Sequence, residues 1–425
     1  MPDDTNVGRA RHRYPRTALW LAGGLAVAVL LWMVVGVPTV VKYPTDLDAS
    51  PRYEGSFSLL VDPVTAAPLA EPVTMPLTVD RHIEAIGDES GSSTVVVRET
   101  IHQVAGDLLD VTQTNQYVMD RSSIENVADE RAYAFDPDNV VDRSGSYRLN
   151  LPFDTSRDET YHIYKNEIGD TYELVGDRET PTTDLEGLHL SNFTAGLDEA
   201  PLSDAYLAEL TRTVPLPDSM TLDQLKPQLL AAGVDVDSLV AALTPVLTPE
   251  DAATLSGFAA EPIPIEYVLS LAGQAAVEPL TGAEVRVSVS ESVGARPVLT
   301  SLPVLQDVLS HYPGVPEAVA TSAALDDLAV APASPLFEYS YEQTPASVAD
   351  VADTVTAMRR QVLLAKVWLP LGLAAGAIGS LIVGAVVFLR RRPRPIDTTE
   401  RERPHPAPDA DSEERELATT GRDTR

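Results

Sequence analysis

The sequence predicts an α+β protein whose antiparallel, β-rich central domain is barrel-like or sandwich-like, carries inserted helices and is flanked by two transmembrane α-helices. Three observations predict this class. Uncharged apolar stretches cover residues 17–41 and 367–389. Hydrophobicity alternates with a period of two from Tyr53 to about Leu197, which is typical of strands with one buried face. Between residues 201 and 258 the period lengthens into that of short Leu- and Ala-rich helices.

The two apolar stretches are long enough to cross a bilayer. They hold 25 and 23 uncharged residues, whereas about 20 helical residues span a hydrocarbon core of about 30 Å. A cleaved signal peptide is the alternative for the first stretch, but its apolar region would be about 7–15 residues long and would end at a small-x-small cleavage site. The first stretch is longer, and Val37–Val41 offers no such site. We therefore expect two uncleaved membrane-spanning helices, at 17–41 and 367–389.

Basic residues beside the two stretches predict the orientation. Short flanks rich in Arg or Lys stay in the cytoplasm, and such flanks precede the first stretch and follow the second. We expect a plasma-membrane protein with a cytoplasmic basic tail at 1–16, an extracytoplasmic domain at 42–346 and a disordered cytoplasmic tail at 390–425. The flanking residues are Arg9, Arg11, Arg13 and Arg16 before the first stretch, Arg390, Arg391, Arg392 and Arg394 after the second, and the more widely spaced Arg359, Arg360 and Lys366 on its outer side.

Small residues recur at a spacing of four in both apolar stretches. Such a row lets a second helix approach closely, so it predicts helix–helix packing, either between the two stretches of one chain or in a homo-oligomer. Small residues are also common in membrane helices for no special reason. The predicted packing residues are Gly372, Gly376, Ser380 and Gly384 in the second stretch and Gly24 and Ala28 in the first.

The central region is strongly acidic and the whole chain lacks cysteine. Residues 42–366 hold 18 Lys and Arg against 52 Asp and Glu. Binding of nucleic acid or an anionic lipid surface by charge needs the opposite sign, so nucleic acid is excluded as a partner. Solubility is the simplest role of this charge, although a cationic ligand or a salty medium would also suit it. Disulfides, thiolate chemistry and iron–sulfur clusters are excluded, and a region of this length can bury a core without them.

Strands are expected wherever β-branched residues are dense and alternate with polar ones. Turns at Gly87-Asp88 and Gly106-Asp107 separate the first of these segments, so consecutive antiparallel strands are predicted. The expected strand segments are 56–61, 94–101 and 109–114 within the first region, then 263–293 and 336–341.

Helices are expected where capping residues precede Leu- and Ala-rich runs. Thr221 and Gln224 form a capping-box pattern, and Thr248 is followed by a proline and two acidic residues. Ser347 is expected to cap a last helix, with Asp350 at its third position. This amphipathic stalk, 347–366, would run directly into the second apolar stretch. Further helices are predicted at 303–311 and 316–328.

Catalytic and metal-binding motifs are absent from the sequence. There is no G-x-S-x-G elbow, H-E-x-x-H pair, phosphate loop or dinucleotide fingerprint. The segment Asp136–Asp142 begins like a calcium loop, but Val140 and Val141 occupy the positions of a ligand and of the required glycine. A polar turn is the better interpretation, with an irregular cation site as the alternative. We therefore predict no enzyme activity, no catalytic residue, no cofactor and no metal.

Three further segments carry a family resemblance. The segment Leu151–Thr155, with Tyr161 and Tyr164, resembles the PFDT block of actinobacterial PorA-family proteins, a domain family of unknown function. Val277–Gly282 resembles the VEP.TG hairpin of that family, although Ala275 and Ala276 stand where an aromatic residue is usual. Phe337–Tyr341, the stalk and Trp368–Pro370 resemble its carboxyl end. The resemblance implies a two-anchor membrane protein and establishes no site residue. The layout alone is similar to that of class B scavenger receptors.

The leading functional hypothesis is a non-enzymatic envelope protein that binds or transfers lipids or other apolar molecules. Its motivation is the apolar helical insert at about 201–258, which would form a lipid-accepting mouth; capping of an open sheet is the simpler reading of the same helices. A structural or scaffolding partner in envelope assembly is the alternative, and a hydrolase with a site assembled from distant residues is the third. Porin activity disagrees with the sequence, because the strands lack the continuous apolar band of a membrane barrel.

Overall fold

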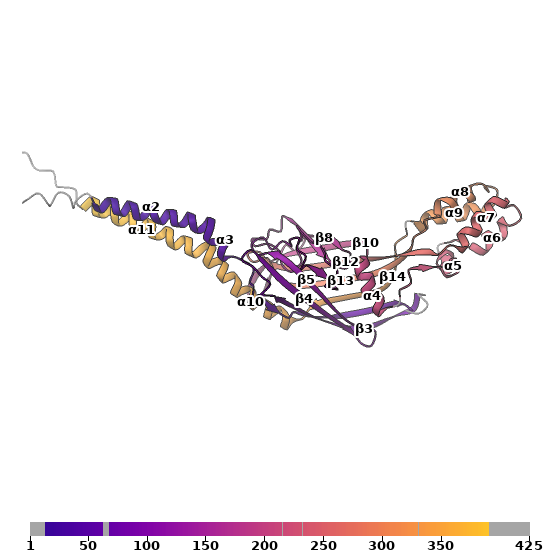
Figure 1. The fold of residues 1–425 in the computed structure, drawn as a ribbon, viewed down its shortest axis with the longest axis horizontal. Coiled ribbons are helices and arrows are strands. Elements are labelled where there is room, and N and C mark those ends of the chain that lie inside the picture. The colour runs from indigo at the N-terminus through magenta and orange to yellow at the C-terminus, as the bar shows by residue number, and fades with distance from the viewer. Residues whose placement is uncertain (1–12, 63–67, 215, 232, 330, 391–425) are drawn as a thin grey trace, which may run out of the picture. The chain divides into compact units, whose positions relative to one another are not determined.

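The computed structural model describes residues 13–62, 68–214, 216–231, 233–329 and 331–390. The predicted tails at 1–16 and 390–425 lie almost wholly outside these residues. Two compact units divide the chain (Figure 1): the described residues up to Val29 together with those from Gly372 form one, and Leu30–Leu371 forms the other.

Two apolar helices in the described part of the chain are long enough to cross a membrane, Trp20–Val40 and the apolar part of Pro345–Arg390. Each contains a widened π-helical turn where the sequence predicted a regular helix. In order, the elements are α2 (Arg13–Leu31), η2 (Trp32–Gly36) and α3 (Val37–Val40), then α10 (Pro345–Leu363), η3 (Leu364–Trp368) and α11 (Leu369–Arg390).

Proline explains both π turns. Pro38 and Pro370 each lie two residues beyond a π turn. Proline has no N–H for the carbonyl four residues earlier, and its ring crowds that carbonyl. These carbonyls belong to Val34 and Lys366, the central residues of the two turns. A local widening accommodates the defect without ending the helix.

The second unit is built on a curved antiparallel sheet, which confirms the predicted α+β class. Of the two predicted forms, barrel-like and sandwich-like, the structure shows the first, as a half-barrel. Its main path runs β6-β5-β4-β3-β2-β14-β13-β12-β10-β8-β7. Single bridges, Met119 to Asn126 and Tyr147 to Ile163, tie β5 and β7 to the segment that lies between these two strands in the sequence. The strands are β1 (Asp48–Ala49), β2 (Arg52–Val61), β3 (Pro68–Ala85), β4 (Thr94–Ala105), β5 (Leu109–Asp120), β6 (Tyr133–Ala134), β7 (Thr160–Lys165), β8 (Asp170–Gly176), β9 (Thr182–Leu185), β10 (Leu188–Pro201), β11 (Ser219–Met220), β12 (Ile263–Glu278), β13 (Ala283–Pro297) and β14 (Ser334–Gln343).

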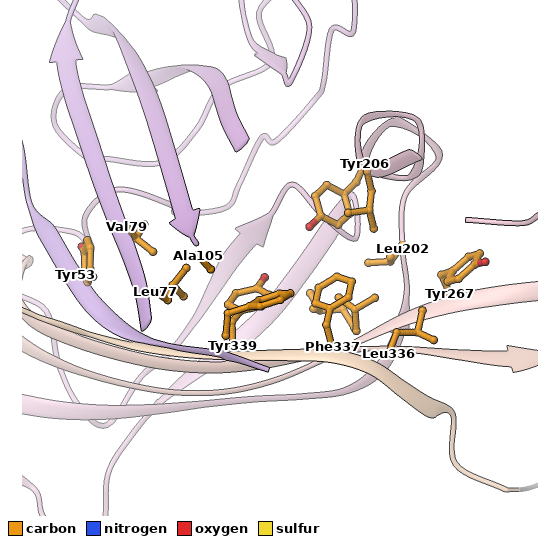
Figure 2. Packing of buried hydrophobic residues seen from close by; sticks show 14 residues of the cluster. Tyr53, Leu77, Val79, Ala105, Leu202, Tyr206, Tyr267, Leu336, Phe337 and Tyr339 are labelled. Atoms are coloured by element: carbon orange, nitrogen blue, oxygen red, sulfur yellow. The ribbon is translucent and has the colours of Figure 1, made fainter. Parts of the chain in front are cut away.

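The predicted strand segments are all strands in the structure. Alternation along each strand places every second side chain on the inner face of the curved sheet. β4 and β5 pair in register from Thr94 with Asp120 to Ala105 with Leu109 around the predicted turn at Gly106. A cluster of buried hydrophobic residues, several of them aromatic, packs against the sheet (Figure 2). Tyr206, carried by the helix α4 (Asp204–Thr213), points toward Phe337 and Tyr339 of β14.

Five helices make a separate apolar cluster beyond one end of β12 and β13. The cluster packs on Ile263, the first residue of β12, which pairs β11 through Met220. The opposite end of β12 is the hairpin at Glu278–Ala283; β12 has 16 residues, so it is roughly 50 Å long at the usual strand rise. The helices are α5 (Leu222–Ala231), α6 (Val236–Leu243), α7 (Pro249–Ala260), α8 (Leu302–Ser310) and α9 (Pro316–Ala329).

Helix capping agrees with the sequence except in the stalk. The Thr221–Gln224 capping box is present, and Thr248 caps α7 by accepting the Asp251 N–H at 3.1 Å. The last helix is capped by Thr344 instead of Ser347, which accepts no cap bond of its own and instead donates its N–H to Thr344 at 3.3 Å. Pro345 has a φ angle that is already suitable for the first helical position, so the helix begins three residues nearer the N-terminus than predicted.

Two of the segments that carried the family resemblance, Leu151–Thr155 and Val277–Gly282, meet each other, and the second contacts the stalk. Gly282 of the VEPLTG hairpin accepts the Leu151 N–H at 2.9 Å, and Leu280 accepts the Asp154 N–H at 3.3 Å. Glu278 in the same hairpin holds the Thr281 N–H at 2.9 Å and pairs with Arg359 of α10 at 3.3 Å. The hairpin therefore links the PFDT block to the stalk.

Candidate functional site

An apolar cavity of about 290 Å³ lies inside the helical cluster α5–α9. Leucine and valine dominate its wall, and no charged side chain lines it among the described residues. Ser256 and Thr321 are the two polar side chains in the lining. Such a cavity favours an apolar guest, because polar groups placed in it would lose their hydrogen bonds to water. Representative wall residues are Leu225, Leu229, Leu239, Leu243, Leu305 and Leu325.

The cavity follows from how the short helices begin and turn. Asp235 caps α6 by accepting the Ser238 N–H at 3.0 Å, which directs Leu239 and Leu243 inward at a spacing of four. Thr248 starts α7 only a few residues after α6 ends, and the Tyr312 hydroxyl, an acceptor of the Thr248 N–H at 3.0 Å, ties this corner to the end of α8. Helices this short are stabilised mainly by packing against one another, and here their leucines meet around a space that no side chain fills.

Unlike the helical cavity, the interior of the sheet holds buried charged side chains beside its hydrophobic clusters. Glu99 on β4 is fully buried and accepts hydrogen bonds from Arg81 Nε and, at 2.8 Å, from the Tyr117 hydroxyl. Arg148 approaches the same carboxylate at 3.8 Å. Burial raises the pKa of Glu99, but Arg81 and Arg148 outweigh that effect and lower it to about 2. The carboxylate is therefore charged at every physiological pH.

A second buried ion pair crosses the same interior. Lys165 Nζ of β7 lies 2.8 Å from Glu291 of β13 and 3.1 Å from Glu167, and the Tyr339 hydroxyl donates to Glu291. Burial lowers the pKa of Lys165, but the two carboxylates outweigh it, so the net direction is upward. Charged pairs joined across strands fill the space that an apolar tunnel would need.

The sequence analysis did not identify this charged network. Neighbouring residues of β4 point to opposite faces of the sheet, because side chains alternate along a strand. Arg98 faces outward and pairs with Glu84 at 3.3 Å, whereas Glu99 faces inward and is buried. A charged residue at an inward position of the alternating pattern was the signal that identifies this network.

Glu284 of β13 faces a small chamber of about 100 Å³ in this interior, lined also by Arg81, Arg148 and Glu167. Its carboxyl makes no hydrogen bond to a described residue, and Glu167 Oε2 and Arg148 Nε are buried without a hydrogen-bond partner. Burial raises the pKa of Glu284. The charges of Arg81 and Arg148 lower this pKa and the charge of Glu99 raises it, and the net direction is upward. A volume of this size holds about three waters.

Replacing Glu284 with Gln is expected to stabilise the protein at neutral pH. An acid with a raised folded pKa destabilises the fold above its unfolded pKa, increasingly as pH rises through the folded value. Glu284→Gln should increase the free energy of unfolding by on the order of 1 kcal/mol at pH 7 and leave it unchanged below about pH 4. Chemical unfolding at both pH values measures this. Glu338→Gln, on the exposed face of β14, is the control; an equal gain there would contradict the assignment.

The residues predicted to pack the apolar helices are only partly brought together. Half-buried positions on α11 include Ala377, Ser380 and Gly384, whereas Gly372 and Gly376 are exposed. A Cβ at Gly376 would lie 3.7 Å from Leu25 Cδ1, so the row passes the edge of the contact. Positions four apart turn by about 40° per step around a helix of 3.6 residues per turn, so one row cannot keep facing one partner. In α2, Ala28 is half-buried and Gly24 is exposed.

Other sequence predictions can be placed on the structure. Asp136 accepts the Asp138 N–H at 2.9 Å, so this segment is the polar turn that the sequence favoured. Within the described ranges, no group of three His, Asp or Glu side chains is arranged to hold a metal ion.

Two helices long and apolar enough to cross a membrane, beside a half-barrel with buried charges and a helical cluster around an apolar cavity, are compatible with a membrane protein that has a large β-rich domain. Comparison with protein families identifies the family of the chain. The chain belongs to the PorA family, because the family model described as Porin PorA matches residues 16–386. No curated protein matches the chain.

Proposed function

We propose that this protein is a non-enzymatic plasma-membrane protein whose extracytoplasmic domain binds the apolar part of a lipid, or another apolar envelope molecule, in the α5–α9 cavity. The single observation that carries the proposal is the uncharged cavity of about 290 Å³. Cavities of this kind, mostly apolar with few polar groups, are the usual form of small-molecule sites. The arginine flanks support an orientation with both termini in the cytoplasm.

Porin activity has less support in the side chains. A membrane barrel needs a continuous apolar band on its outer face, but outward positions of β3 and β4 carry the Glu84–Arg98 pair. Lys165, Glu167 and Glu291 also occupy the interior where a pore would run.

Native mass spectrometry of the detergent-extracted full-length protein tests the proposal. We expect an apolar molecule to co-purify with the unmodified protein. Leu255→Trp, in the cavity wall, should reduce its occupancy at least tenfold, since even one methylene changes binding in an apolar pocket by roughly 10–200-fold. Val319→Trp, on an exposed position of α9 outside the lining, is the matched control. A protein that carries no apolar molecule in any preparation would refute the proposal.

A scaffolding role in envelope assembly is the second candidate. Large apolar side chains are exposed on the helical cluster, among them Leu230, Val246, Val304 and Val319, and exposed apolar groups often mark protein contacts. Chemical crosslinking in cells distinguishes this role: adducts through the helical cluster would favour it, and monomers alone would remove it.

A further inference from the structure

The lining of the cavity reaches the surface of the protein at α6 and α7. Four of its lining residues are also exposed to solvent: Val240 on α6, and Ala252, Ser256 and Ala259 on α7. The three α7 residues are spaced by four and three positions, so they lie along one face of that helix. From these exposed lining residues we place the opening of the cavity between α6 and α7, where α7 contributes only small side chains.

The wall behind this opening limits what can enter. Leu225, Leu239 and Leu243 are buried behind it, and Thr321 is the one polar side chain at depth among the lining residues. A charged or strongly hydrogen-bonding group placed there would lose its water without a partner. An alkyl chain loses nothing of that kind, so the headgroup of an amphiphile has to stay outside.

The cavity volume sets the length of the chain. An apolar protein cavity of about 150 Å³ accommodates benzene, with six carbons. By the same proportion, 290 Å³ accommodates about twelve carbons. A single medium-length chain fills this space, whereas two chains of a complete lipid do not fit.

We infer that the opening between α6 and α7 is the entrance for one unbranched alkyl chain of about twelve carbons, whose headgroup remains at the rim formed by Ala252, Ser256 and Ala259. This inference rests on the proposed function and adds to it the entrance, the number of chains and their length.

Photolabelling of the full-length protein in nanodiscs tests the inference. The probes are straight-chain primary alcohols of 8, 12, 16 and 18 carbons that carry a terminal diazirine. Mass spectrometry gives the ratio of label on cavity-lining peptides to label on α11, which reports the probe dissolved in the bilayer. A methylene that fits the cavity moves from the apolar bilayer to an equally apolar site, so its transfer changes the free energy of binding little. The labelling ratio should therefore be similar at 8 and 12 carbons. Each methylene left in water costs about fourfold, so the ratio should fall at least tenfold by 16 carbons.

Substitutions at the rim locate the entrance. Ala252→Trp and Ser256→Trp should each reduce cavity labelling at least tenfold, because the indole closes the gap. Ala253→Trp, at an exposed position of the same helix outside the lining, should leave labelling unchanged. All three sites are exposed, so the fold tolerates the larger side chain.

The outcomes separate the two proposals. A ratio that stays constant or rises up to 18 carbons, or equal labelling of Ala252→Trp and Ala253→Trp, overturns the inference and leaves an apolar site in place. No label in the cavity at any chain length overturns the proposed function itself.

Discussion

Replacing Glu99 with Gln is expected to lower the free energy of unfolding by about 3–5 kcal/mol, the usual cost of removing one partner of a buried ion pair. Glutamine keeps the shape of the side chain but removes the charge that Arg81 and Arg148 face. The two guanidinium groups then lose the carboxylate that they contact, and the Tyr117 hydroxyl loses a charged acceptor. Urea unfolding of the full-length protein, followed by circular dichroism, measures the change.

The same carboxylate makes stability sensitive to acid. The pKa of Glu99 is lowered to about 2 in the folded protein, from an ordinary value of 4.5. A depressed folded pKa contributes stability above the unfolded pKa, and this contribution is lost as pH falls toward 2. The free energy of unfolding of the unmodified protein should therefore fall by about 3 kcal/mol as the pH falls through this range. The free energy of unfolding of Glu99→Gln should fall much less.

An exposed pair provides the control for Glu99. Glu84 pairs with Arg98 on the outer face of the same two strands, where both side chains are more than a third exposed. Glu84→Gln should cost less than 1 kcal/mol. Similar losses at Glu84 and Glu99 would show that the buried network does not act as described.

Replacing Gly282 with Ala is expected to destabilise the sheet domain by several kcal/mol. Gly282 has φ +71°, which L-residues adopt at a cost of about 1–2 kcal/mol. A Cβ there would lie 2.0 Å from the Leu151 carbonyl oxygen and 2.5 Å from that of Pro152. Both contacts are with backbone, so relief requires the PFDT block to leave the hairpin and break the bond between Leu151 N–H and Gly282 O.

Gly187 separates backbone strain from the steric clash. It has φ +77°, and a Cβ there would meet nothing within 4 Å. Gly187→Ala should therefore cost only the backbone preference, about 1–2 kcal/mol. Equal losses for Gly187→Ala and Gly282→Ala, measured by thermal unfolding, would contradict the proposed contact between the hairpin and the PFDT block.

Much of the secondary structure was predictable because it depends on local pattern. The capping box at Thr221, the helix start at Thr248 and the turn at Gly106 follow from side chains that bond within a few residues. The prediction that Ser347 caps the last helix was wrong because Thr344 is also a capping residue, and Pro345 places the first helical position directly after Thr344. The helical insert was recognised as apolar, but its cavity was not, because a cavity depends on how five separate helices pack.

The sequence by itself determined that this chain has two apolar helices, an acidic domain without cysteine and an antiparallel sheet with inserted helices. Each of these depends on composition or on a period along one segment. Only the tertiary structure decided that Glu99 and Lys165 meet their partners inside the sheet, and that leucines from α5 to α9 surround an open cavity. Those arrangements join residues up to 126 positions apart, such as Lys165 and Glu291, and no local pattern specifies which distant strands or helices become neighbours.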